Sequence, residues 1–237
     1  MENMQSAFGA IPREQSPTDF HLGAFTPPTY PDTFLPTYPV TIENQNHTPS
    51  CGAHAGAYVK DIFGTTRVSP EYLWKKIKQV DGFGVDNGTT LDVILQTLQK
   101  QGICSFDLLP NNSNVTNAQY ADPSTLTPQM DADAQTRKIS AYAFQFNPTI
   151  DDLKSAIYTH KAVIMQLNVG AEFWTKKDGT YSWSESDLLP LDPNRAQVTS
   201  GHFMVAAGYV KITPTELQGL KDGIICLVDL RQKYGTK

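Results

Sequence analysis

The segment QNHTPSCGAHAGAYVKDIF, residues 45–63, places a cysteine where a helix is predicted to begin. Cys51 follows a Thr-Pro-Ser triplet and precedes an apolar run rich in small residues, which Gly64 ends. Peptide N–H groups at a helix start carry partial positive charge, which lowers the pKa of a cysteine and favours its thiolate. Cys51 is therefore a candidate nucleophile. A second interpretation stays open, because free cysteines are also among the residues most often buried in a core.

Length and composition are those of an ordinary globular protein. The chain has 237 residues, 40% of them hydrophobic and 18% charged, with sixteen prolines and sixteen glycines, which fits one large mixed α and β domain or two tightly joined halves. A net charge of −5 without a run of Lys or Arg makes nucleic acid and anionic membrane surfaces unexpected partners. Residues 1–12 lack the basic start and apolar core of an export signal. We expect a soluble chain in the cytoplasm or another reducing compartment.

The cysteines indicate reduced thiols rather than disulfides or a metal centre. Cys51, Cys104 and Cys226 cannot all pair within one chain, and none belongs to a CxxC or Cys/His cluster with zinc-ligand spacing. We therefore expect neither a metal nor an organic cofactor.

The first part of the chain is predicted to be an extended arm followed by a helical half at about residues 40–109. The arm, residues 1–39, is rich in proline, which lacks the N–H that a regular helix needs, so it is expected to wrap the surface. A short strand at 40–43 is followed by three helices that begin with capping residues or apolar periodicity: 53–63, 69–80 and 90–101.

The second part is predicted to be a polar connector followed by a β-rich half. Residues 110–137 carry repeated Asn, Ser, Thr and Asp, which is typical of a long surface loop. Residues 138–237 form the β-rich half, with one helix at 150–160. Its strands are expected at 139–146, 162–169, 203–210 and 224–229. Residues 40–237 would then be one domain, with a groove between its halves as the default binding site.

A cysteine nucleophile needs a base, and a histidine held by a third polar group is the usual one. His202, in SGHFMVAAGYV, lies at the start of an apolar strand that would fix its ring, and we take it as the base. His54 is the alternative, because it follows Cys51 by three residues on the same helical face. The other histidines are expected to be solvated or at a helix end: His21, His47 and His160.

The third polar group is predicted to be Asp229, which ends the apolar strand GIICLVD. A carboxylate there would hold the tautomer of the His202 ring and stabilise the imidazolium. The alternative is that Asp229 only begins a turn.

With these residues in place, the chain resembles the papain-like cysteine peptidases, most closely their divergent bacterial and viral-type members, over about residues 39–229. The likeness is carried by a glutamine six residues before the cysteine, the small-residue helix, the VSPEYLW helix start and the segment DNGTTLDVILQTLQKQGIC. GHFMVAAGY is similar to the family's histidine strand. Each motif alone is weak, but their order and spacing are specific.

The resemblance implies an α+β papain-like fold, in which a helical first half packs against a second half with a barrel-like antiparallel sheet. The active site would lie in the cleft between them. By the same resemblance Cys51 attacks a peptide bond of a peptide or protein substrate, and His202 serves as base and then acid. The Gln45 side chain and the Cys51 N–H would bind the oxyanion.

Further site residues follow from the same resemblance. Asn87, Gly88 and Thr89 align with the glycine-rich segment of the family that pairs with the substrate backbone. Thr89 stands where a second glycine is common in that segment. Asp229 stands for the orienting asparagine, without the tryptophan that normally follows it.

The chain departs from the family in other places too. Thr48 replaces a cysteine that is usually in a disulfide, and Gly52 replaces the tryptophan after the nucleophile. The sequence ends at Lys237, before the family's closing hairpin, and the arm is too rich in proline for the usual helical inhibitory pro-segment. Two alternatives to a peptidase therefore stay open: a non-catalytic papain-fold binding module, and a Cys-His-Asp acyltransferase or isopeptidase.

Overall fold

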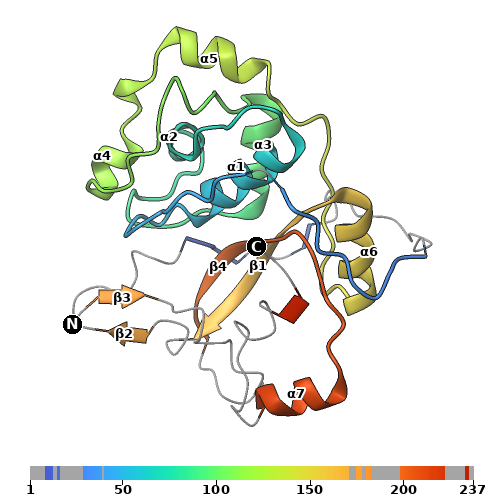
Figure 1. The fold of residues 1–237 in the computed structure, drawn as a ribbon. Helices are drawn as coiled ribbons and strands as arrows, with labels where there is room; N and C mark the ends of the chain where they lie inside the picture. Colours follow the sequence, from blue (N-terminus) through green and yellow to red (C-terminus); the bar gives the residue numbers. More distant parts are fainter. Residues whose placement is uncertain are drawn as a thin grey trace.

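The computed structural model describes residues 9–12, 15–16, 29–38, 40–170, 175–177, 180–182, 198–221 and 233–234. Figure 1 shows two regions, with the helices of the first half above the strands β1 and β4 and with α6 beside these strands. None of the helices in these ranges is long and apolar enough to cross a membrane.

The first half is helical because its caps and its apolar periodicity agree. The three helices are α1 (Cys51–Phe63), α2 (Pro70–Lys78) and α3 (Leu91–Lys100), as the sequence predicts. Ser69 caps α2 by accepting a hydrogen bond from the Tyr72 N–H at 3.0 Å, with proline in the first turn. Gly64 ends α1, and Gly102, with φ of +78°, follows α3 in the left-handed conformation that glycine tolerates best.

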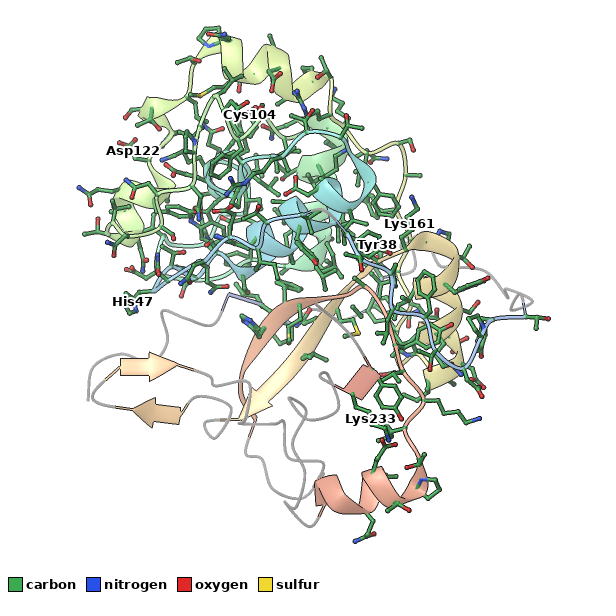
Figure 2. All side chains as sticks on the ribbon, viewed as in Figure 1. Tyr38, His47, Cys104, Asp122, Lys161 and Lys233 are labelled. Carbon is green, nitrogen blue, oxygen red and sulfur yellow. The ribbon has the colours of Figure 1, made fainter. Side chains whose placement is uncertain are left out.

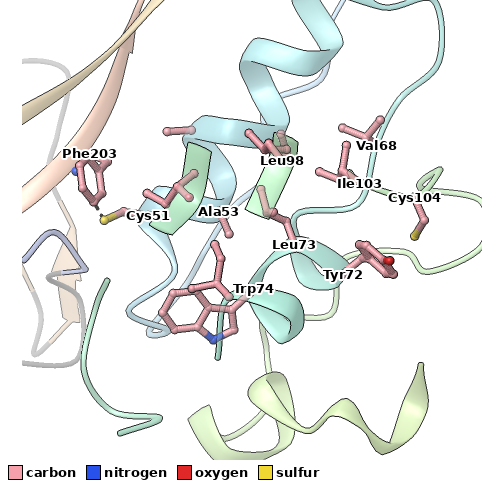
Figure 3. Close-up of a cluster of buried hydrophobic side chains, with 14 of the residues drawn as sticks. Cys51, Ala53, Val68, Tyr72, Leu73, Trp74, Leu98, Ile103, Cys104 and Phe203 are labelled. Carbon is pink, nitrogen blue, oxygen red and sulfur yellow. Dashed lines mark hydrogen bonds between the residues drawn. The ribbon is translucent and has the colours of Figure 1, made fainter. Parts of the chain in front are cut away.

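The helical half is held together by one apolar core, to which α2 contributes the largest side chains. Trp74, Tyr72 and Leu73 are fully buried, and they pack with residues of α1 and α3 (Figure 3). The axes of α1 and α3 come close because Gly52 faces Ile94, whose Cδ1 atom would lie 2.4 Å from a Cβ at that position. Small residues in α1 therefore serve packing.

The connector is not the long loop that its polar composition predicts. It contains α4 (Asn117–Ala121), a 3-10 turn (Pro123–Thr125) and α5 (Pro128–Gln135). A capping box starts α4, in which Thr116 and Gln119 satisfy each other's backbone N–H groups. These helices are short, and both their caps and the burial of Tyr120, Ala121 and Ala134 in the apolar core fix them.

The second half has less sheet than expected. β1 (Val163–Gly170) pairs antiparallel with β4 (Val198–Ala206), while β2 (Thr175–Lys177) pairs with β3 (Thr180–Ser182). Within the described ranges both sheets are open and two-stranded, so the barrel-like sheet was a wrong prediction. Of the expected helices, α6 (Ile150–His160) is confirmed, and α7 (Pro214–Lys221) is an addition.

Other strand predictions also need correction. Residues 40–43 and 139–146 form no strand; in the latter segment Tyr142, Phe144 and Phe146 make successive ring contacts with centroids 5.6 and 6.2 Å apart. The strand expected at 203–210 begins earlier and stops at Ala206. Beyond it, Tyr209 pairs with Phe34 of the arm instead of with β1. The strand expected at 224–229 lies outside the described residues.

Part of the arm lies against the second half. Phe34 and Tyr209 exchange two backbone hydrogen bonds, of 2.8 and 2.7 Å, and the Tyr38 hydroxyl donates to the Lys161 carbonyl at 2.9 Å (Figure 2). The backbone pairing of Phe34 and the hydrogen bond of Tyr38 attach this part of the arm to the second half.

Candidate active site

Cys51 is the first residue of α1 and lies where this helix packs on β4. The thiol is only 1% exposed, and the Phe203 N–H donates a hydrogen bond to Sγ at 3.4 Å (Figure 3). A Cβ added at Gly52 would lie 3.1 Å from the Phe203 ring, so the glycine allows this close approach of helix and strand. The predicted nucleophile is therefore in contact with the residue that follows His202.

His202 lies in β4 opposite Leu167 of β1, and it is partly buried. Its neighbour Gly201 is glycine for a spatial reason, because a Cβ there would lie 2.4 Å from the Ala10 carbonyl oxygen. The packing of the α1 start on β4 thus brings Cys51 into contact with Phe203, the residue that follows the predicted base.

Gln45 lies six residues before Cys51, at the turn that precedes α1. Its Nε2 donates to the Thr48 carbonyl at 3.1 Å, while the Thr48 N–H and hydroxyl donate to the Gln45 carbonyl at 3.1 and 2.7 Å. The amide is thereby held in the turn that leads into the cysteine.

The loop before α3 forms backbone hydrogen bonds with residues 9–11 of the arm. Thr89 is fully buried, yet its N–H and C=O both form hydrogen bonds with residues 9–11. Gly88 has to be small, since a Cβ there would lie 2.0 Å from the Gly9 oxygen. Asn87 lies further from this pairing, in an exposed turn closed by its own N–H to Gly84 at 2.9 Å. Threonine is tolerated at 89 because the pairing uses only its backbone.

Residues 9–11, which we name the arm strand, occupy the position between this loop and β4 (Figure 1). Ala10 pairs parallel with Thr89 and antiparallel with Gly201. Three hydrogen bonds hold the arm strand: Thr89 N–H to Gly9 O at 2.8 Å, Ile11 N–H to Thr89 O at 2.7 Å, and Ala10 N–H to Gly201 O at 3.1 Å. The arm strand therefore bridges both halves directly beside the thiol.

Gly9 is the part of the arm strand nearest to the nucleophile. A Cβ at this position would lie 2.7 Å from Cys51 Sγ and 2.1 Å from the Pro49 oxygen. Sequence reasoning missed this contact because pairing through the backbone needs no particular side chain. The small pair Gly9 and Ala10 is no distinctive signal, because the arm has a second such pair at Gly23 and Ala24.

Comparison with solved structures places this arrangement in a known fold. Xylellain, a cysteine protease from Xylella fastidiosa, aligns with a TM-score of 0.69 at 21% identity, covering 87% of this chain and 81% of its own. ProCathepsin B S9 from Trypanosoma congolense aligns with a TM-score of 0.62 at 16% identity, covering 88% and 73% respectively. The chain has a papain-like fold. No family model and no curated protein matches the sequence.

Burial determines the charge states of Cys51 and His202. It raises the pKa of the Cys51 thiol to about 11, although hydrogen bonds from the Phe203 and Gly9 N–H groups act in the opposite direction. Burial also lowers the pKa of His202 to about 4. With the arm strand in place, thiol and imidazole are both neutral at pH 7.

His54, the alternative base, makes its described contacts within the helical half. Its Nδ1 lies 3.1 Å from both the Ser50 hydroxyl and the Ser50 carbonyl, and its ring stacks on Tyr120 with centroids 6.4 Å apart. Asn111 Nδ2 lies 3.5 Å from its Nε2. Burial lowers the pKa of His54 to about 4. These contacts favour a structural role at the start of α1.

The remaining predicted site features are described only in part. Asp229 and Cys226 lie outside the described residues. Cys51 and Cys104 are free thiols, and no group of three or more potential metal ligands occurs in the part of the chain that the structure describes. His47 is exposed at the edge of the helical half (Figure 2).

Proposed function

We propose that this protein is a papain-like cysteine peptidase that cleaves peptide bonds through an acyl-enzyme on Cys51. The observation that carries the proposal is the contact of the Cys51 thiol with the residue after His202, across the junction of α1 and β4. The fold supports it, since the structures it resembles include a cysteine protease. No cofactor is needed for this chemistry.

The first half of the reaction forms a thioester. His202 takes the thiol proton as Cys51 Sγ attacks the carbonyl carbon, and the oxyanion receives hydrogen bonds from the Cys51 N–H and the Gln45 amide. His202 then gives its proton to the departing amine as the carbon–nitrogen bond breaks. In the second half, water attacks the thioester, His202 takes a proton from it, and the carboxylate product leaves as the thiol is restored.

The substrate is proposed to bind as an extended strand. Thr89 offers its backbone N–H and C=O, and Gly201 offers its carbonyl oxygen, all three of which now pair with the arm strand. Gly88 keeps this face open to another backbone. Because these are backbone contacts, they bind any extended peptide and select little for side chains. Asp229 is proposed to orient the His202 ring.

The test is cysteine-dependent hydrolysis of a fluorogenic peptide mixture under reducing conditions. It is run on the full chain and on Gly9→Leu, whose side chain has no room beside the thiol. Cys51→Ala should remove all turnover in both backgrounds, whereas Cys104→Ala, which alters the other described buried thiol, should retain it. Turnover that survives Cys51→Ala would contradict the proposal, as would its absence from every form of the chain.

A non-catalytic papain-fold module is the second candidate. It is favoured by one observation, the neutral and covered Cys51 thiol. An activated thiolate reacts with iodoacetamide at mildly acidic pH, where ordinary thiols are slow. Slow labelling of Cys51 in Gly9→Leu, together with no hydrolysis, would favour this module over the peptidase.

A further inference from the structure

A chain of hydrogen bonds joins the His54 ring in α1 to the turn that contains Gln45. His54 Nδ1 lies 3.1 Å from the Ser50 hydroxyl oxygen, and that oxygen lies 2.6 Å from Thr48 Oγ1. The Thr48 hydroxyl in turn donates to the Gln45 carbonyl at 2.7 Å. Ser50 and Thr48 are fully buried, so these contacts are out of reach of bulk water. We name residues 44–48 the oxyanion turn, because Gln45 is the proposed oxyanion donor.

The hydrogens of this chain all point away from the ring. The His54 ring is neutral at pH 7, because burial lowers its pKa to about 4, so one ring nitrogen donates and the other accepts. Nδ1 is the donor, since it also lies 3.1 Å from the Ser50 carbonyl oxygen, which can only accept. The Ser50 hydroxyl then gives its hydrogen to Thr48, whose own hydrogen goes to the Gln45 carbonyl. Each hydroxyl therefore accepts one hydrogen and donates one.

The other ring nitrogen faces the connector, which contacts the same turn. Asn111 Nδ2 lies 3.5 Å from His54 Nε2 and donates to the Asn44 carbonyl at 3.1 Å. The Tyr120 hydroxyl fixes the orientation of Asn111 by donating to its Oδ1 at 2.7 Å. Ser113 donates to the Asn44 carbonyl as well, at 2.6 Å. The connector thus holds the first residue of the oxyanion turn, while the chain from His54 holds its last residue.

The position of the Gln45 amide depends on Thr48. Gln45 Nε2 donates to the Thr48 carbonyl at 3.1 Å, and the Thr48 N–H donates to the Gln45 carbonyl at 3.1 Å. Between them Asn46 has a φ of +48°, a conformation that is uncommon outside glycine and persists where surrounding contacts hold it. An oxyanion donor is effective when it is fixed in place before the reaction. A shift of Thr48 would therefore misplace the amide.

From these contacts we propose that His54 is a positioning residue, which holds the Gln45 amide in place for the oxyanion. It acts through the hydroxyls of Ser50 and Thr48 and does not touch the substrate. The proposal rests on the peptidase function above and adds a residue to it. A role in packing alone would lower stability, whereas this role lowers the rate of the chemical step.

The test compares three side chains at residue 54 by hydrolysis of a peptide substrate, on the full chain and on Gly9→Leu. His54→Phe keeps a ring but has no donor, and His54→Asn restores an N–H close to the position of Nδ1. We expect His54→Phe to lower kcat roughly tenfold with KM within about twofold, because the loss is confined to the transition state. His54→Asn should recover most of this loss. His160→Phe, at an exposed helix end, is the matched control and should change neither constant.

A double-mutant cycle shows whether His54 acts through Gln45. Gln45→Ala should lower kcat about 100-fold. Adding His54→Phe should then cost no more than about twofold, because the amide that it positions is gone. A further tenfold loss in the double variant would overturn the proposal, as would a change in KM alone.

Smaller changes keep the test valid if His54→Phe does not fold. Ser50→Ala and Thr48→Val each remove one hydroxyl from the chain and should each lower kcat roughly tenfold. Ser50→Ala/Thr48→Val should lower kcat no further, since a chain in series needs to be broken only once. Independent, multiplying losses in the double variant would contradict the proposed role.

A measurement by NMR separates this proposal from the peptidase function. The side-chain amide hydrogens of Gln45 are assigned by their absence from Gln45→Ala, and their exchange with water is measured. We expect exchange at least about tenfold faster in His54→Phe, because the turn opens more often, and close to the unaltered rate in His54→Asn. Faster exchange without hydrolysis in any form would overturn the peptidase function while supporting the positioning. Equal exchange in all forms would overturn the positioning by His54.

Discussion

At the scale of single residues, two opposing effects act on Cys51, and burial is the stronger. The start of α1 and two N–H donors favour the thiolate, but removal from water favours the thiol and leaves its pKa at about 11. The helix start near Cys51 was predictable from the sequence of its neighbours. The covering by Gly9 was not, since burial of a thiol depends on a segment far away in the chain.

The pH dependence of labelling follows from that pKa. With the arm strand seated, the rate of Cys51 labelling should keep rising with pH up to about 11, because the thiolate forms only there. In Gly9→Leu we expect the rise to be complete at a lower pH. Iodoacetamide labelling across a pH series, read by mass spectrometry, gives both curves. A plateau at neutral pH in the unaltered chain would contradict the burial of this thiol.

His54 predicts an acid sensitivity of the fold. Its pKa is about 4 in the folded chain, against 6.5 for an exposed ring, so only the unfolded state takes up the proton between these values. Stability is therefore complete above pH 6.5 and is lost as the pH falls towards 4, by about 3 kcal/mol. His54→Gln, which cannot titrate, should lose less in urea unfolding over this window. An identical pH dependence for both proteins would exclude this role.

At the scale of elements, sequence reasoning succeeded where side chains fix the backbone. Ser69 and Pro70 start α2, and the apolar stripe of α3 matches its buried face. It failed where contacts between residues far apart in the sequence determine the secondary structure. Residues 139–146 form no regular strand, although Tyr142 and Phe144 make a ring contact, and Tyr209 pairs with Phe34 rather than extending β4. The barrel was expected by resemblance, not from the pattern.

Lys78, at the end of α2, holds the loop that contains Gly88. At the end of α2 its Nζ donates to the Gly88 carbonyl at 2.9 Å and to Asp81 at 2.8 Å, and it lies 4.5 Å from the centre of the Trp74 ring. Lys78→Met keeps the apolar stem but loosens the loop. We expect KM for peptides in the Gly9→Leu background to rise about tenfold, roughly the 1.4 kcal/mol of one hydrogen bond, with a smaller change in kcat.

Controls separate this effect from general destabilisation. Lys100→Met removes an exposed lysine that bonds only within α3 among the described contacts and should leave KM unchanged. Lys78→Met also leaves the buried Asp81 carboxylate without its ion-pair partner, which should lower the free energy of unfolding in urea by about 3 kcal/mol. The double variant Lys78→Met/Asp81→Asn should recover part of this loss. If KM stays constant while stability falls, Lys78 supports the fold alone.

At the scale of the whole molecule, the arm contacts both halves through residues 9–11 and the β-rich half through residues 30–38. Phe34 packs edge-on against Tyr158 with centroids 5.2 Å apart, and it lies 6.0 Å from Tyr209. A half-buried aromatic side chain of this kind contributes less to the free energy of unfolding than a fully buried one. The arm should therefore stabilise the β-rich half as well as cover the site.

Phe34→Ala tests the attachment of residues 30–38. We expect a loss of about 2 kcal/mol in urea unfolding, below the range for a fully buried phenylalanine. Labelling of Cys51 should also become faster, because the arm strand loses its second attachment. Thr37→Ala, at an exposed arm position, is the matched control. Unchanged stability and labelling in Phe34→Ala would mean that this attachment does not hold the arm.

The central claim, that Cys51 forms the acyl-enzyme, is tested most directly by trapping that intermediate. A slow ester substrate is mixed with Gly9→Leu, quenched in acid and digested, and the peptides are mapped by mass spectrometry. The account predicts an acyl group on the peptide that contains Cys51, absent in Gly9→Leu/Cys51→Ala and depleted in Gly9→Leu/His202→Asn. Turnover of the ester with an acyl group on Cys104, or with no acyl group on any cysteine, would contradict it.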